Sequence, residues 1–148
     1  TSGLVLFCKH PFFQAYCDKN MEEHHIKKEY IALVQGHTNY KNKKIISNIA
    51  RDRHNAKKMI IHPNGKESVS IFNTLKNYKD CSLIQVTILT GRKHQIRVQC
   101  ASLNHPILND PLYGGKKIDN TGLLLQSHHI QFNDVDITCP QEKRFIRK

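Results

Sequence analysis

The segment spanning residues 83–103 constrains the fold of this chain more than any other stretch. Residues 83–89, LIQVTIL, are typical of a strand, and Thr90-Gly91 is a turn directly after it. The basic stretch that follows predicts a short helix with Ile96 and Cys100 on its apolar face and Thr90 as its cap. Asn104-His105-Pro106 ends the helix, because the residue before a proline disfavours helical backbone. Side chains at this strand-to-helix junction should therefore be held rigidly and project into a cleft.

Short strands dominate the rest of the chain. Alternating or apolar runs predict strands at residues 4–7, 28–35, 44–49, 57–61, 68–75, 123–125, 130–132 and 135–138. Pro11 suits the first turn of a helix that carries Phe12, Phe13, Tyr16 and Met21 on or near one stripe. Turn signals at residues 62–66 and 77–80 make the middle of the chain an antiparallel meander. The prediction is an α+β fold, with a mixed, mainly antiparallel sheet and a few flanking helices, in one domain over residues 1–148.

The charge balance indicates the class of partner. The chain has 23 Lys and Arg against 12 Asp and Glu, for a formal net charge of +11. An excess of this size usually marks a polyanion partner, since each neutralised phosphate releases condensed counterions. RNA or DNA is the expected partner, while solubility alone is the alternative explanation of the charge. A membrane partner is not expected, because the apolar runs are short and no amphipathic helix gathers lysines on one face.

Cysteine and histidine give no sign of a metal site. The five cysteines form no Cys-x-x-Cys pair, and their odd number leaves one unpaired, as in a reducing compartment. The adjacent residues of His24-His25 and of His128-His129 point apart on a helix or strand, with no further ligand at zinc spacing. We therefore expect no metal, and thiols that are buried or inert.

Three blocks of residues together resemble a known family. They are Thr90-Gly91-Arg92-Lys93-His94-Gln95-Ile96-Arg97, the segment from His105-Pro106 to Tyr113-Gly114, and Lys28-Glu29-Tyr30-Ile31-Ala32-Leu33-Val34-Gln35-Gly36. The last matches the pattern Lys-x-Tyr-x-Ala-x-Val-x-Gly position for position. These blocks resemble the pseudouridine synthases of the large ribosomal RNA and transfer RNA group. The resemblance covers residues 1 to about 145, with departures at Lys93, Gln99 and Asn109, where Thr, His and Gly are commoner. It implies a catalytic domain that isomerises uridine in ribosomal or transfer RNA without a cofactor.

The resemblance assigns roles to residues that have ordinary explanations when taken alone. A lone Arg is most often a solvated surface residue, and a strand Tyr is most often a core aromatic. In the family, the Arg that ends Gly-Arg-x-His-Gln-Ile-Arg pairs with the catalytic Asp, and the matching residue here is Arg97. The family's active-site Tyr, matched by Tyr30, stacks on the target uracil and can relay a proton. Further substrate contacts are expected from Ile96 and Val98, as an apolar wall, and from Arg92 and His94.

A basic stretch in the meander is the expected grip on the RNA backbone. Arg51, Arg53, Lys57 and Lys58 are the residues predicted to hold phosphates, with ordinary solvated charge as the open alternative. The loop from His105 to Gly114 is expected to be structural rather than catalytic.

The first residues match only the end of a family motif. Thr1-Ser2-Gly3 corresponds to the tail of His-Arg-Leu-Asp-x-x-Thr-Ser-Gly, whose nucleophilic Asp lies three residues before the Thr. We therefore expect a partial catalytic domain that is inactive alone, from an enzyme that is a monomer in the cytoplasm or an organelle. Two alternatives stay open: a non-catalytic RNA-binding relative, and a His-rich metalloprotein.

Overall fold

Strand β2 (Lys27–Gln35) lies at the centre of the structure, and its sequence explains why. Ala32, Leu33 and Val34 are all 0% exposed, so the strand is covered on both faces. A continuous apolar run suits such a strand, whereas a strand with one wet face would alternate. β6 (Cys81–Ile88) and β7 (Leu125–Phe132) pair with its two edges, both antiparallel.

The computed structural model describes residues 1–23 and 25–147, and eight strands in this part form one sheet. Their order is β1-β7-β2-β6-β5-β3-β4, and β8 pairs with β7 beside β1. All pairs are antiparallel except β1 with β7. The other strands are β1 (Ser2–Gly3), β3 (Lys43–Arg51), β4 (Met59–Ile61), β5 (Lys66–Asn77) and β8 (Val135–Thr138). The helices are α1 (Pro11–Glu22) and α2 (Gln95–Ser102), with 3₁₀ turns η1 (Pro111–Tyr113) and η2 (Lys143–Phe145). The expected α+β class with a mainly antiparallel sheet is confirmed.

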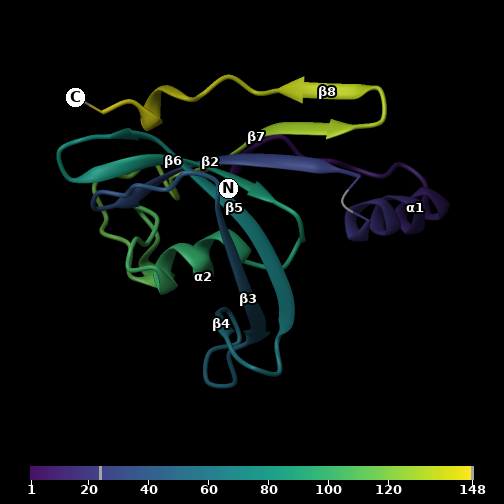
Figure 1. Ribbon diagram of the computed structural model, residues 1–148, viewed down its shortest axis with the longest axis horizontal. Coiled ribbons are helices and arrows are strands. Elements are labelled where there is room, and N and C mark those ends of the chain that lie inside the picture. Colours follow the sequence, from purple (N-terminus) through teal and green to yellow (C-terminus); the bar gives the residue numbers. More distant parts are fainter. Residues whose placement is uncertain (24, 148) are drawn as a thin grey trace.

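The sheet twists strongly, so that β3 and β5 leave the body at a steep angle and carry β4 at their end (Figure 1). We call residues 43–66 the arm. α2 lies in the angle between the body and the arm (Figure 1) and contacts both. On the body side Ile96 and Cys100 join the main core, while on the arm side Val98 packs with Ile49 and Tyr113. A helix buried on two sides in this way holds its remaining side chains in fixed directions.

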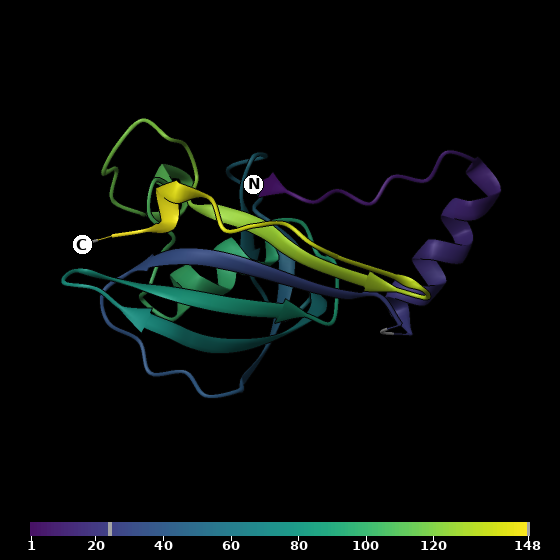
Figure 2. The same cartoon turned by 90° about the horizontal axis from the view of Figure 1, so that it is seen from above.

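α1 stands apart from α2, at the opposite end of the sheet (Figures 1 and 2). Pro11 occupies its first turn, as expected, and Cys17 anchors it in a small core with Ile26 and Ile130. Of the expected stripe, Met21 packs against this core, whereas Phe12, Phe13 and Tyr16 are 86%, 50% and 44% exposed.

The predicted strand at residues 4–7 is wrong. β1 ends at Gly3, which has a φ of +89° and turns the chain away from β7. A side chain at Gly3 would meet the Ser127 carbonyl oxygen at 2.1 Å, so this close approach requires glycine. The run that follows has no partner strand among the described residues, and Val5 and Phe7 are 85% and 80% exposed. Apolar composition without a place on a sheet edge does not make a strand.

Thr90 does not cap α2, contrary to the expectation. The helix begins later, after His94 in the left-handed region with a φ of 56°. The Thr90 hydroxyl instead donates to Gln95 Oε1 at 2.9 Å and accepts from the Val69 N–H at 2.9 Å. Gln95 Oε1 also accepts from the Arg92 N–H at 3.0 Å. One buried glutamine therefore organises the turn between strand and helix.

The other predicted elements are present, with shifted ends. The two short runs expected at residues 123–125 and 130–132 are joined in β7, because Gln126 and Ser127 are buried despite their polarity. Gln126 satisfies its amide by donating to the Pro140 carbonyl at 2.8 Å and accepting from the Glu142 N–H at 3.2 Å. Among the described residues, no helix has the length and apolar character needed to cross a membrane.

Replacing Phe72 tests where the core lies. Phe72 is 0% exposed and meets Tyr40 edge-on at 5.7 Å, so Phe72→Ala should lower the free energy of unfolding by about 3–5 kcal/mol. The matched control Phe12→Ala, at an 86% exposed position, should cost less than about 0.5 kcal/mol. Urea denaturation followed by circular dichroism measures both, and equal losses would contradict this core.

Candidate active site

A pocket of about 360 Å³ opens where the start of α2 faces β2, β6 and β7. Tyr30 reaches it from β2 and Arg97 from α2, so these two side chains face one space rather than opposite sides of the sheet. Its lining residues are Thr1, Tyr30, Ile88, Arg92, His94, Gln95, Ile96, Arg97, Leu123 and Leu125. The volume lies within the roughly 300–1,000 Å³ of small-molecule sites.

Arg97 is held by a carboxylate that comes from the next loop. Its Nε and Nη2 donate to Asp110 Oδ2 and Oδ1 at 2.8 and 2.7 Å. The Asp110 side chain is 1% exposed and that of Arg97 is 17% exposed. The hydrogen bonds to Asp110 raise the pKa of Arg97 above its ordinary value, against the opposing effect of burial. A two-point contact of this kind fixes the plane and direction of the guanidinium.

The Tyr113 ring packs against the Arg97 guanidinium, and the Tyr113 hydroxyl links the pair of Arg97 and Asp110 to the arm. Its ring lies 4.8 Å from the Arg97 guanidinium carbon and 5.7 Å from Lys58 Nζ. Its hydroxyl accepts the Met59 N–H at 2.8 Å and lies 2.9 Å from His94 Nδ1. One buried tyrosine thus contacts the site, the start of α2 and β4 together.

His94 and Tyr30 give the pocket uncharged polar groups beside its cations. Burial lowers the pKa of His94, and the nearby Arg97 and Lys93 lower it further, so the neutral imidazole predominates at neutral pH. Burial raises the pKa of the Tyr30 phenol, an effect partly offset by the neighbouring Ser127 side chain. Both groups therefore remain neutral while Arg97 stays charged.

Among the residues expected to contact substrate, Arg92, His94 and Ile96 line this pocket together with Tyr30 and Arg97. Val98 does not: two residues beyond Ile96, it points to the other side of α2 and packs against the arm. The roles of Arg92, His94, Ile96 and Val98 in substrate binding stay predictions.

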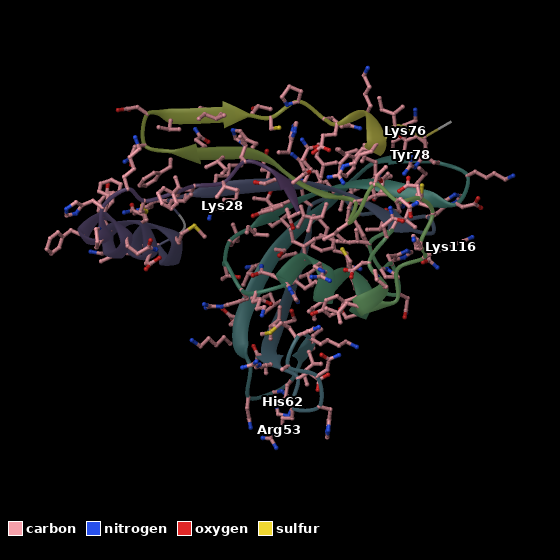
Figure 3. The ribbon with its side chains drawn as sticks, turned by 180° about the vertical axis from the view of Figure 1, so that it is seen from behind. Lys28, Arg53, His62, Lys76, Tyr78 and Lys116 are labelled. Atoms are coloured by element: carbon pink, nitrogen blue, oxygen red, sulfur yellow. The ribbon has the colours of Figure 1, made fainter. Side chains whose placement is uncertain are left out.

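The basic residues of the arm lie away from the pocket. Arg51 and Arg53 line a separate hollow of about 350 Å³, and Figure 3 shows Arg53 and His62 at the tip of the arm. Lys57 is exposed in the same loop, and Lys58 turns back over the Tyr113 ring. The structure therefore brings the four cations onto one projection, with Tyr113 as the link to the site.

Sequence reasoning missed Asp110 and Tyr113, whose loop was expected to be only structural. A signal was present: an Arg at the edge of a core needs a carboxylate, and Asp110 stands between the apolar Leu108 and Pro111-Leu112. The departure Asn109 also has a local reason, since its φ of 61° is a conformation that Gly and Asn adopt readily. Gln99, where His is commoner, is buried and donates to Ser47 and Ser68 while accepting from Ser70.

In the part of the chain that the structure describes, no three His, Cys, Asp or Glu side chains are grouped as metal ligands. His25, His128 and His129 lie within that part, and His24 lies outside it.

Comparison with known proteins defines the class. The sequence model of the family described as RNA pseudouridylate synthase matches residues 1–102. The chain is 39% identical over 117 residues to an uncharacterized RNA pseudouridine synthase, YhcT, of Bacillus subtilis, covering 78% of this chain and 39% of that one. It is 40% identical over 121 residues to ribosomal large subunit pseudouridine synthase C of Buchnera aphidicola, covering 80% and 38%. Against pseudouridine synthase D of Borreliella burgdorferi the identity is 32% over 151 residues, covering 99% and 45%.

The chain also shares its fold with a solved structure. The solved structure of human RNA Pseudouridylate Synthase Domain Containing 1 matches with a TM-score of 0.77 at 24% identity, over 90% of this chain and 62% of that one. The chain belongs to the RNA pseudouridylate synthase family. It spans less than half the length of each of the three relatives named above.

Neutralising Asp110 tests how much the buried pair stabilises the fold. Asp110→Asn keeps the shape but removes the charge, so the half-buried Arg97 loses its counter-ion and the free energy of unfolding should fall by about 3–5 kcal/mol. The control Asp136→Asn breaks a pair with His129 at a 61% exposed carboxylate and should cost less than about 1 kcal/mol. Urea denaturation at pH 7 compares the two, and similar losses would refute a special role for the Asp110 pair.

Proposed function

We propose that this chain forms the uridine-binding part of an enzyme that converts uridine to pseudouridine in ribosomal or transfer RNA. The proposal rests on Tyr30 and Arg97, which are 67 positions apart in the sequence but line the same pocket. Isomerisation breaks the bond between uracil N1 and ribose C1′, turns the base, and joins C5 to C1′, so that the C5 proton is lost and N1 takes up a proton. The site must therefore hold a detached uracil without letting it leave.

The lining of the pocket suits this task. Ile88, Ile96 and Leu125 supply apolar walls, and the Tyr30 phenol supplies a ring on which the base can stack. Stacking on an aromatic side chain contributes about 1–3 kcal/mol per base. This gain offsets part of the few kcal/mol that flipping a base out of its stack costs.

The catalytic carboxylate is proposed to enter beside Arg97. In the family motif the Asp lies three residues before the Thr that matches Thr1, and Thr1 lines the pocket. The pair with Asp110 uses Nε and Nη2 of Arg97, which leaves Nη1 for a second carboxylate. Arg97 would keep that carboxylate ionised for its attack.

We also propose that residues 1–148 form a single, partial catalytic domain, since all the described strands belong to one sheet, and that the enzyme is a monomer. All five cysteines are free thiols, which supports a reducing compartment such as the cytoplasm or an organelle.

The first test is catalysis by a polypeptide that carries the motif His-Arg-Leu-Asp-x-x ahead of Thr1. It should release tritium from RNA labelled at uracil C5, and Arg97→Lys should reduce kcat by about 10²–10⁴-fold, because lysine cannot form the two-point contact with Asp110. The control Arg147→Lys changes an Arg outside the pocket, paired with Asp119, and should retain activity. RNA binding without isomerisation in the unsubstituted protein would favour the non-catalytic RNA-binding alternative.

The second test concerns the arm. If Arg51 and Arg53 each hold one phosphate, Arg51→Ala/Arg53→Ala should weaken RNA binding and reduce the slope of log affinity against log salt by about 1.4, from 0.7 for each single-stranded phosphate contact. Lys76→Ala/Lys116→Ala removes the same charge at the other end of the molecule (Figure 3) and should leave the slope nearly unchanged. Fluorescence anisotropy with a labelled oligoribonucleotide measures both, and equal slopes for the two variants would place the RNA elsewhere.

A further inference from the structure

A second pocket adjoins the one that holds Tyr30 and Arg97. It has a volume of about 610 Å³ and lies between α1, the end of β6 and the start of β5. Its lining residues are Asp18, Met21, Lys28, Glu67, Thr90, Gly91 and Arg92. Arg92 lines both pockets, so the two spaces are neighbours that share a basic wall.

Lys28 lines the second pocket from β2, two residues before Tyr30, which lines the first. Because side chains alternate along a strand, Lys28 and Tyr30 lie on one face of β2, about 7 Å apart. The β2–β6 register is regular here, with Lys28 opposite Ile88 and Tyr30 opposite Val86. The β2–β7 pairing is irregular between Glu29 and Tyr30, but the extra residue there, His128, belongs to β7. Lys28 and Tyr30 therefore face the same side of the sheet, each at one of the two neighbouring pockets.

The position of Lys28 is unusual for a lysine. Burial lowers its pKa, an effect partly offset by the nearby Cys17, and Figure 3 shows it between α1 and the middle of the sheet. Its neighbour Lys27 points to the other face, where it pairs with Glu29 at 2.9 Å. A half-buried ammonium at the edge of a cavity gains most from an anion that can enter the cavity.

The chemistry of the second pocket matches a nucleotide rather than a bare anion. Lys28 and Arg92 provide cationic donors next to the first pocket, and Arg92 is oriented by the bond from its Nε to the Glu67 carbonyl oxygen at 2.9 Å. The Asp18 and Glu67 carboxylates provide acceptors in the same space. A phosphate needs the former, whereas a ribose hydroxyl or a base amino group needs the latter.

We propose that this second pocket binds the nucleotide next to the target uridine, with the phosphate between the two held by Lys28 and Arg92. The proposal rests on the proposed function, because it takes the first pocket as the place of the uridine. It makes Lys28 a contact through which the enzyme recognises the strand around its target, in addition to the arm.

The experiment compares uridine with the dinucleotide uridylyl-(3′→5′)-uridine as probes, in an NMR titration of the 148-residue chain. The dinucleotide should bind about tenfold more tightly, the factor that one charge-assisted hydrogen bond gives. It should shift the amide signals of Lys28 and Gly91, which uridine should leave in place. Lys28→Gln should abolish the difference between the probes, Lys28→Arg should restore it, and Lys27→Gln on the opposite face should not change it.

Three results would overturn the proposal: equal affinity for the two probes, a dinucleotide affinity that Lys28→Gln leaves unchanged, or binding of inorganic phosphate at Lys28 as tight as that of the dinucleotide. Turnover by the polypeptide extended with the family motif separates this failure from failure of the proposed function. There Lys28→Gln should raise KM for RNA about tenfold at nearly constant kcat, since the contact exists before and during reaction. An active enzyme whose KM is unchanged by Lys28→Gln would contradict only the proposed role of the second pocket. An inactive enzyme that still binds the dinucleotide through Lys28 would contradict only the proposed function.

Discussion

The buried pair of Arg97 with Asp110 is the interaction on which the site depends. Both oxygens of a carboxylate that is 1% exposed are bound by one guanidinium, so neither group can turn without leaving a charge unpaired in the interior. The pair joins α2 to the loop that carries η1, and Tyr113 stacks beneath it. The direction in which Arg97 faces the pocket is thereby fixed by the fold, before any substrate enters.

The pair of Arg97 with Asp110 also determines where positive charge lies in the pocket. Arg97 stays positive beside Asp110, while burial keeps both His94 and Tyr30 neutral. A pocket with a fixed cation and neutral polar neighbours favours an ionised carboxylate, and its aromatic ring favours a base that can stack. The hydroxyl of Tyr113 extends this arrangement to the Met59 N–H, so the basic arm and the pocket share one support.

Much of the fold follows from local pattern. β2, β6 and the junction before α2 could be predicted because apolar runs, turn residues and the helix stop act over a few neighbouring positions. Local pattern failed where the outcome depended on a distant surface. Residues 4–7 have the composition of a strand, but Gly3 turns them off the edge of β7. Thr90 has a side chain that could cap a helix, but its hydroxyl is hydrogen-bonded to Gln95 and to the Val69 N–H instead.

The sequence by itself indicated the family, the order of its motifs along the chain and, through the resemblance, the two residues expected to meet, Tyr30 and Arg97. Only the tertiary structure decided which carboxylate neutralises Arg97, that Val98 faces the arm, and that the pocket lined by Lys28 adjoins the one that holds Tyr30 and Arg97. The physical reason is that residue types follow from the needs of each element, whereas ion pairs and pockets require side chains from separate elements to converge. That convergence is set by the twist of the sheet and by the two-sided burial of α2, which no short stretch of sequence encodes.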